Sequence, residues 1–141
     1  MEATATTTVD RPPEAAFEYM DVPENQARIS PRLSTVETLG TLDNGGKRAR
    51  YTYQLFGLRF EGEVCGIEHE PPERIVFEMT GDIEGRIEWS FEPVAEGTRV
   101  TYAAAYDLGL PAALESILGP IADRFNRREL ERTLETLRTR L

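Results

Sequence analysis

The chain has 141 residues, of which 40% are apolar and 29% charged, and its formal net charge is −9. This length and composition predict one globular domain with a single hydrophobic core, and the acidic balance disfavours binding to nucleic acids or anionic lipid surfaces. No run of 18 apolar residues occurs, so stable insertion into a membrane is not expected. Cys65 is the only cysteine and the N-terminus lacks the features of a signal peptide, so we expect no disulfide and a cytoplasmic location.

The basic residues are 15 arginines and one lysine, Lys47. Such a shortage of lysine, together with an excess of carboxylates, is typical of proteins from salt-loving organisms. We therefore expect a halophilic protein; a GC-rich genome, which favours arginine codons, is the alternative explanation.

The predicted elements begin with a strand over residues 4–9, followed by two short helices. Pro12 and Pro13 open the first helix, and the second lies between Pro23 and Pro31. Further along, apolar residues recur with a period of two, which predicts a meander of antiparallel strands. These strands cover residues 36–42, 47–55, 58–67, 74–79, 83–92 and 98–108.

Pairing these strands in register places the apolar residues on one face of the sheet and the charged residues on the other. One expected register pairs Met79 with Ile83 and so brings Phe77 beside Gly85. The other expected pairs are Leu55 with Leu58, Tyr53 with Phe60, Tyr51 with Gly62, Ala49 with Val64, Trp89 with Tyr102, Phe91 with Val100, Ile87 with Ala104, and Gly85 with Tyr106.

The last predicted element is a long helix from Pro111 to the C-terminus, with an interruption at Gly119-Pro120. Its apolar stripe contains Ala122, Leu130, Leu134, Leu137 and Leu141. Asn126 lies within this stripe and is the polar residue that we expect to face the sheet. Because this helix is the one element large enough to cover the apolar face, we expect the sheet to wrap around it.

This order of elements resembles the START-like superfamily, and within it the polyketide cyclase/dehydrase and lipid-transport group, often labelled SRPBCC. The resemblance is carried by "RPPEAAFEYM", "EHEPPERIVFEMTG" and "GRIEWSFEPVAEGTRVTYAAAYDL" and spans nearly the whole chain. It implies one START-like domain, residues 1–141, with the α+β helix-grip fold: a curved antiparallel sheet around a long C-terminal helix, and two short helices after the first strand. It also implies an apolar pocket for a lipid, a polyketide or a similar molecule. These motifs shape strands and turns, so no catalytic residue is transferred.

His69 is the single histidine and precedes Pro71 and Pro72, so we expect a solvated histidine in a turn rather than an acid–base group or a metal ligand. One histidine and one cysteine cannot supply a usual zinc site, and we predict neither a metal nor a cofactor. Cys65 has no base near it in sequence and is expected to act as a small apolar residue.

The residues predicted to bind a ligand lie on the apolar face of the sheet and on the long helix. Tyrosine combines apolar area with one hydrogen-bonding tip, which suits a greasy molecule that carries a few oxygens. The predicted set is Tyr51, Tyr53, Phe60, Phe77, Gly85, Ile87, Trp89, Tyr102, Tyr106 and Asn126. Glycine at residue 85 is interpreted as leaving space for a pocket, the alternative being a bend in the sheet.

Leucine and phenylalanine are unusual in tight turns, which normally carry Gly, Pro, Asn, Asp or Ser. The turn at residues 55–58 and the segment at residues 108–111 are both rich in leucine and fall at the same end of the predicted meander. We expect an apolar mouth of the pocket at this end, formed by Leu55, Phe56, Leu58, Leu108 and Leu110. A contact with a protein partner or a homodimer contact would produce the same pattern.

The sequence therefore predicts a protein that binds a small hydrophobic molecule as a carrier or sensor. One alternative is an enzyme of the polyketide aromatase/cyclase type, in which tyrosine or asparagine polarises a carbonyl. Another is a protein-interaction module of the chaperone-activator kind. No catalytic constellation is visible in the sequence, and the catalytic residues of such an enzyme stay unassigned.

Overall fold

A computed structural model describes residues 2–55, 57–107, 109 and 111–141 of the chain. Within these residues the first elements are strand β1 and the helices α1 and α2, and the last is helix α3. The bounds are β1 Glu2–Val9, α1 Pro13–Met20, α2 Pro23–Ile29, β2 Leu33–Thr41, β3 Lys47–Leu55, β4 Leu58–Glu70, β5 Arg74–Gly81, β6 Glu84–Val94, β7 Gly97–Asp107 and α3 Ala112–Arg140. All predicted elements are present, with ends shifted by a few residues.

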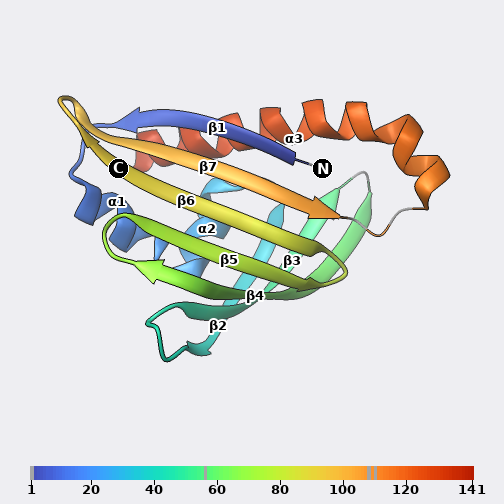
Figure 1. Cartoon of the computed structure of the whole chain (residues 1–141), viewed down its shortest axis with the longest axis horizontal. Helices are drawn as coiled ribbons and strands as arrows, with labels where there is room; N and C mark the ends of the chain where they lie inside the picture. The colour runs from blue at the N-terminus through green and yellow to red at the C-terminus, as the bar shows by residue number, and fades with distance from the viewer. Residues whose placement is uncertain (1, 56, 108, 110) are drawn as a thin grey trace.

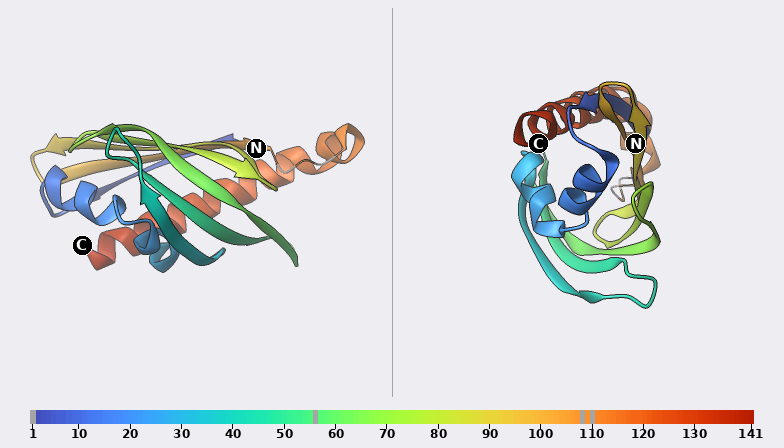
Figure 2. Two further views of the ribbon diagram at one scale, coloured as in Figure 1. Left: turned by 90° about the horizontal axis from the view of Figure 1, so that it is seen from below. Right: turned by 90° about the vertical axis from the view of Figure 1, so that its left-hand side faces the viewer.

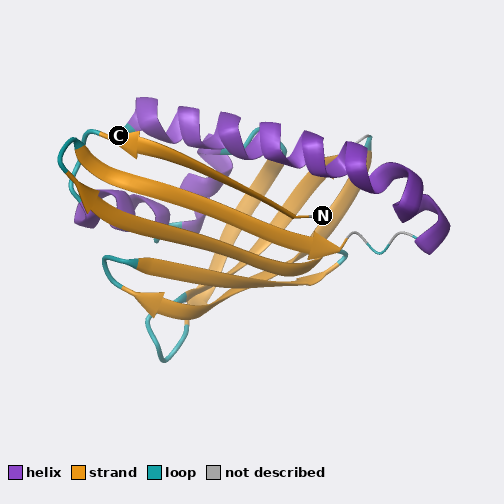
Figure 3. Cartoon of the chain, turned by 45° about the horizontal axis from the view of Figure 1, so that its top comes forward, coloured by secondary structure: helices purple, strands orange, loops and turns teal. Residues whose placement is uncertain are grey.

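The seven strands of the described chain form one antiparallel sheet in the order β1-β7-β6-β5-β4-β3-β2. Strands β2 to β7 are neighbours in the same order as in the sequence, and β1 forms the edge of the sheet beyond β7, with which it pairs. The sheet curves into a trough with α3 along its open side, while α1 and α2 cover one end (Figures 1 and 2). Figure 3 shows the same layers by element type, with α3 running beside β1 and above β2 to β4. The predicted helix-grip fold is confirmed.

The expected register is confirmed for β3 with β4 and for β6 with β7, but it is wrong for β5 with β6. Met79 pairs with Gly85, and Phe77 pairs with Ile87, a shift of two residues from the prediction. The cause is the connection between the two strands. Ile83 leaves the ladder and is buried against Tyr51 and Met79, so the loop is longer than the tight turn that the sequence indicated.

Three clusters make up the core of the described residues, and two of them mark the two parts of the trough. At the end covered by α1, Phe77 and Trp89 pack with Phe17 of α1 and with Leu134 and Leu137 of α3. Towards the other end, a separate cluster is built on three buried residues, Tyr51, Met79 and Ile83, with partly buried aromatic side chains around them. The first part is solid apolar packing, and the second surrounds the candidate site.

Helix α3 buries the stripe that its periodicity predicts, including Asn126, whose exposed fraction is 2%. The predicted interruption at Gly119-Pro120 is wrong, because α3 is one continuous helix with Pro120 inside it. A proline removes one backbone hydrogen bond and tends to bend a helix, and the first turns of α3 diverge from the rest of its axis in Figure 1. These turns extend past the sheet, and their apolar residues Ile117 and Ile121 are exposed.

Candidate functional site

A cavity of about 70 Å³ lies between the sheet, α2 and α3. Six of the ten predicted ligand-binding residues line it: Tyr51, Tyr53, Ile87, Tyr102, Tyr106 and Asn126. Helix α2 and strand β2 contribute further walls through Gln26, Leu33 and Val36, which the sequence analysis did not include. Ligand-binding pockets usually enclose roughly 300–1,000 Å³. The cavity must therefore widen to admit a drug-sized molecule.

The other four predicted residues do not line this cavity, for reasons that the fold makes plain. Phe77 and Trp89 belong to the solid core at the α1 end. Phe60 is half-buried and packs against the cluster around Tyr51 from outside the cavity wall. At Gly85, a Cβ atom would lie 2.2 Å from the carbonyl oxygen of Ala105, so the glycine permits close approach of β7 and does not leave a space.

Polar side chains of α3, β3 and β7 form one group on the cavity wall. The hydroxyl of Tyr106 donates a 2.6 Å hydrogen bond to Oδ1 of Asn126. Tyr53 and Tyr106 share a second side-chain hydrogen bond. Because an amide oxygen can only accept, the hydroxyl proton of Tyr106 is directed to Asn126. This chain of bonds leaves Nδ2 of Asn126 as a buried donor with no hydrogen-bond partner among the described residues.

Glu129 is a lining residue that the sequence analysis missed. It follows Asn126 by one helical turn, and its residue is only 6% exposed. Its Oε1 lies 3.7 Å from a guanidinium nitrogen of Arg132, and its Oε2 lies 3.8 Å from Nε of Arg32. Oε2 makes no hydrogen bond within the described part of the chain. The helical period alone would have placed Glu129 on the buried face, but a charged side chain is normally read as exposed.

Burial disfavours ionisation of the tyrosines around the cavity. Desolvation, with a smaller contribution from the charge of Asp82, raises the pKa of Tyr51 to about 12. Desolvation is also the main cause that raises the pKa values of Tyr53, Tyr102 and Tyr106 above the usual value for a phenol. These hydroxyls are therefore hydrogen-bond donors at neutral pH and cannot serve as bases.

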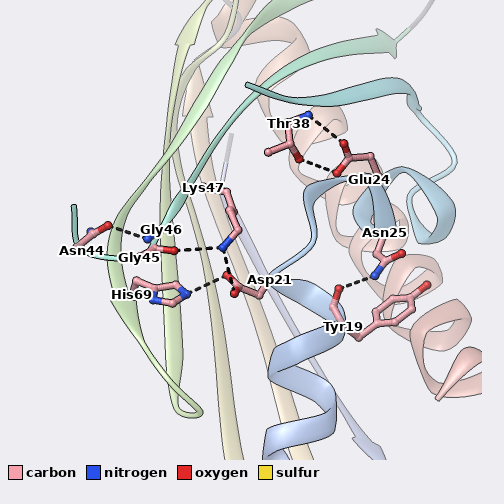
Figure 4. A network of polar contacts seen from close by, with 10 residues as sticks. All are labelled: Tyr19, Asp21, Glu24, Asn25, Thr38, Asn44, Gly45, Gly46, Lys47 and His69. Atoms are coloured by element: carbon pink, nitrogen blue, oxygen red, sulfur yellow. Dashed lines mark hydrogen bonds and ion pairs between the residues drawn. The ribbon is translucent and has the colours of Figure 1, made fainter. Parts of the chain in front are cut away.

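The prediction of a solvated His69 is wrong. Its side chain is 10% exposed, its Nε2 lies 2.9 Å from Oδ1 of Asp21, and its ring meets the edge of the Phe17 ring at 5.3 Å between centroids. Lys47 reaches the other oxygen of Asp21 at 3.4 Å, as Figure 4 shows. Strand β4 continues to Glu70, so His69 lies in the sheet rather than in the turn, and the link between α1 and α2 covers it.

This network joins the helical link to the sheet at the end away from the cavity's polar groups. No group of three or more His, Cys, Asp or Glu within the described ranges could hold a metal ion, and this includes the network around His69. Cys65 is a free, half-buried cysteine, and its expected role as a small apolar residue stays a prediction.

The predicted mouth can be checked for two of its five residues. Leu58 is 56% exposed, but Leu55 is only 2% exposed and adds no apolar surface to a rim. Phe56, Leu108 and Leu110 lie outside the described residues. Helix α3, like the other described helices, is not long and apolar enough to cross a membrane.

Several solved structures share this architecture. A protein from Thermus thermophilus, TTHA0849, superposes with a TM-score of 0.83 at 23% identity, covering 99% of this chain and 96% of the other. A START superfamily protein from Mycobacterium smegmatis gives a TM-score of 0.70 at 15% identity, with 99% and 95% covered. The ZhuI aromatase/cyclase from a Streptomyces species gives 0.72 at 16% identity, with 99% and 92% covered. At these identities the likeness establishes the fold alone.

No curated protein matches the sequence. The sequence model of one family does match, and it covers residues 1–141, which is the whole chain. Its description is "Polyketide cyclase / dehydrase and lipid transport". The chain therefore belongs to the polyketide cyclase/dehydrase and lipid transport family.

Proposed function

We propose that the protein binds a small, mostly hydrophobic molecule in the cavity between the sheet and α3 and acts as its carrier or sensor. The observation that carries this proposal is a cavity lined mainly by apolar and aromatic side chains, with the hydrogen-bonded pair Tyr106 and Asn126 on its wall. A site of this composition favours burial of apolar ligand surface and fixes the ligand's orientation through a few hydrogen bonds. The family description, which names polyketides and lipid transport, supports the same class of ligand.

A cavity-filling variant tests the proposal with Nile red, an uncharged apolar dye. Thr133 is 4% exposed and lines the cavity on α3, so Thr133→Phe should occupy the space and abolish the rise in dye fluorescence. Thr139→Phe, at an exposed position of the same helix, is the matched control and should bind the dye as the parent does. Thermal melts confirm that both variants fold. Equal dye binding by the two variants would show that this cavity is not the binding site.

Native mass spectrometry of freshly purified protein is the complementary measurement. A molecule that copurifies with the parent chain and is lost in Thr133→Phe would identify the natural ligand directly. A protein partner or a homodimer stays a prediction; the native masses report the oligomeric state in the same experiment.

Glu129 favours a second candidate, an enzyme of the aromatase/cyclase type. A carboxylate such as that of Glu129 can remove a proton from the carbon next to a carbonyl group. An amide N–H, such as that of Asn126, can stabilise the negative charge that then develops on the carbonyl oxygen. These two groups lie one helical turn apart on the cavity wall. Incubation with a short poly-β-ketone thioester mimic, analysed by mass spectrometry for loss of water, tests this candidate. Catalysis that survives in Glu129→Gln would contradict the role of Glu129 as the base.

A further inference from the structure

Most boundaries between the walls of the cavity are closed by hydrogen bonds. Neighbouring strands are joined by the ladders of the sheet. Helix α2 is fastened to β2, because the carboxylate of Glu24 accepts hydrogen bonds from the hydroxyl and the N–H of Thr38 at 2.6 and 3.0 Å (Figure 4). Helix α3 is fastened to β7 by the 2.6 Å hydrogen bond from Tyr106 to Asn126.

The boundary between α3 and the start of β2 is held differently. Arg32 directly precedes β2 and reaches α3, where its Nε lies 3.8 Å from Oε2 of Glu129 and its guanidinium lies 5.3 Å from the centre of the Phe125 ring. Neither Nε nor Oε2 has a hydrogen-bond partner among the described residues. The Arg32 side chain is 41% exposed, so water screens the ion pair. This boundary is therefore restrained less firmly than the hydrogen-bonded ones.

Arg32 spans this boundary from outside the cavity. Ser30 and Leu33, on either side of Arg32 in the chain, line the cavity, as does Glu129 across the boundary, but Arg32 does not. The backbone of Arg32 is fixed to the sheet, because its carbonyl oxygen accepts a 2.9 Å hydrogen bond from the N–H of Gln54. The side chain of Arg32 can therefore leave α3 without breaking the pairing of the strands.

We propose that a ligand enters the cavity between α3 and the start of β2, and that release of Arg32 from Glu129 and Phe125 opens this route. This inference rests on the proposed function, since the cavity of about 70 Å³ must widen to admit a ligand. The walls separate where the restraint between them is weakest. The route lies along α3 rather than over the turn at residues 55–58, where the sequence predicted the mouth.

Stopped-flow fluorescence with Nile red tests the route, because it gives the rates of uptake and release separately. Arg32→Ala should raise both rates about fivefold, the combined effect of one exposed ion pair and one cation–π contact. The dissociation constant should stay near that of the parent, since these contacts close the empty and the occupied cavity alike. Arg50→Ala is the matched control: Arg50 lies 3.9 Å from Glu37 in an exposed ion pair between β2 and β3, and its loss should leave both rates unchanged.

Two further variants assign the effect to the partners of Arg32. Glu129→Gln removes the charge of the ion pair and Phe125→Leu removes the aromatic ring, so each should raise the rate of uptake about twofold. When either is combined with Arg32→Ala, the rate should rise no further, because the interaction is already lost. A purely structural role of Arg32 would lower the melting temperature and leave the rates of uptake and release unchanged.

The possible results separate the route from the proposed function. If Nile red does not bind the parent protein, the proposed function is wrong and the inference falls with it. If the dye binds but Arg32→Ala takes it up and releases it at the rates of the parent, the proposed function stands and the inference is wrong. A change in release alone also overturns it, since Arg32 would then contact the bound dye. If Arg32→Ala does not fold, unchanged uptake in both Glu129→Gln and Phe125→Leu overturns the inference, and faster uptake in both supports it.

Discussion

Gly85 tests how the sheet is built. The sequence predicted that this glycine leaves space for a pocket, whereas in the structure it permits the close approach of β7. As a residue that leaves space in the pocket, it should tolerate a larger side chain that fills that space. In the structure, a Cβ atom at this position would lie 2.2 Å from the carbonyl oxygen of Ala105 and 2.5 Å from Cα of Tyr106. Both are backbone atoms of β7, which cannot swing away as a side chain can.

We therefore expect Gly85→Ala to destabilise the protein by about 2–3 kcal/mol, the upper part of the usual range for overpacking. For a domain of this size, that corresponds to a fall in the melting temperature of roughly 5–10 °C. The loss should reflect a displaced pairing of β6 with β7, since the clash falls on the ladder itself.

Gly40 is the matched control, because it also lies within a strand, β2, and a Cβ atom there would meet nothing within 4 Å. Gly40→Ala should be neutral or stabilise by up to about 1 kcal/mol, since alanine restricts the unfolded chain. Urea unfolding of the two variants and the parent gives the three free energies of unfolding. If Gly85→Ala is as stable as Gly40→Ala, the inference that β7 lies too close to Gly85 for a side chain is wrong.

Three further predictions concern salt, pH and the apolar turn. If the charge of −9 reflects adaptation to a concentrated salt cytoplasm, the melting temperature should rise from dilute buffer to about 2 M KCl as repulsion is screened; a flat or falling melting temperature removes the halophilic interpretation. Burial raises the pKa of Tyr51 to about 12, whereas an unfolded tyrosine ionises near ~10. The folded state then holds the proton longer, so stability is complete below about pH 10 and falls as the pH approaches about 12; an unchanged urea midpoint across this range would refute that. Leu55 is buried and Leu58 exposed, so Leu55→Ser should cost about 2–4 kcal/mol and Leu58→Ser less than about 0.5 kcal/mol. If Leu58 borders the mouth, Leu58→Ser also slows the uptake of Nile red in stopped-flow fluorescence, and unchanged uptake would count against the mouth.

The features that the sequence determined by itself depend on local periodicity. The buried stripe of α3 from Ala122 to Leu137 follows from a period of 3.6, and the alternation along β6 and β7 sets their register, with Trp89 opposite Tyr102. Four tyrosines on one face of the sheet follow from the same alternation. A shift of one residue in the pairing of two strands would turn every apolar side chain of the shifted strand towards water. An alternating pattern therefore leaves little freedom in the strand register.

The features that only the tertiary structure decided depend on groups far apart in the chain. His69 is buried because Asp21, 48 residues away, reaches it from the link between two helices. Glu129 faces the cavity because two arginines, one of them far earlier in the chain, compensate its charge. The shift between β5 and β6 arises because Ile83 gains more from the core than from the ladder. In each case the free energy of burying a side chain is balanced against the interactions that it gains or loses with other groups. A local sequence pattern cannot predict this balance, because the interacting groups lie elsewhere in the chain.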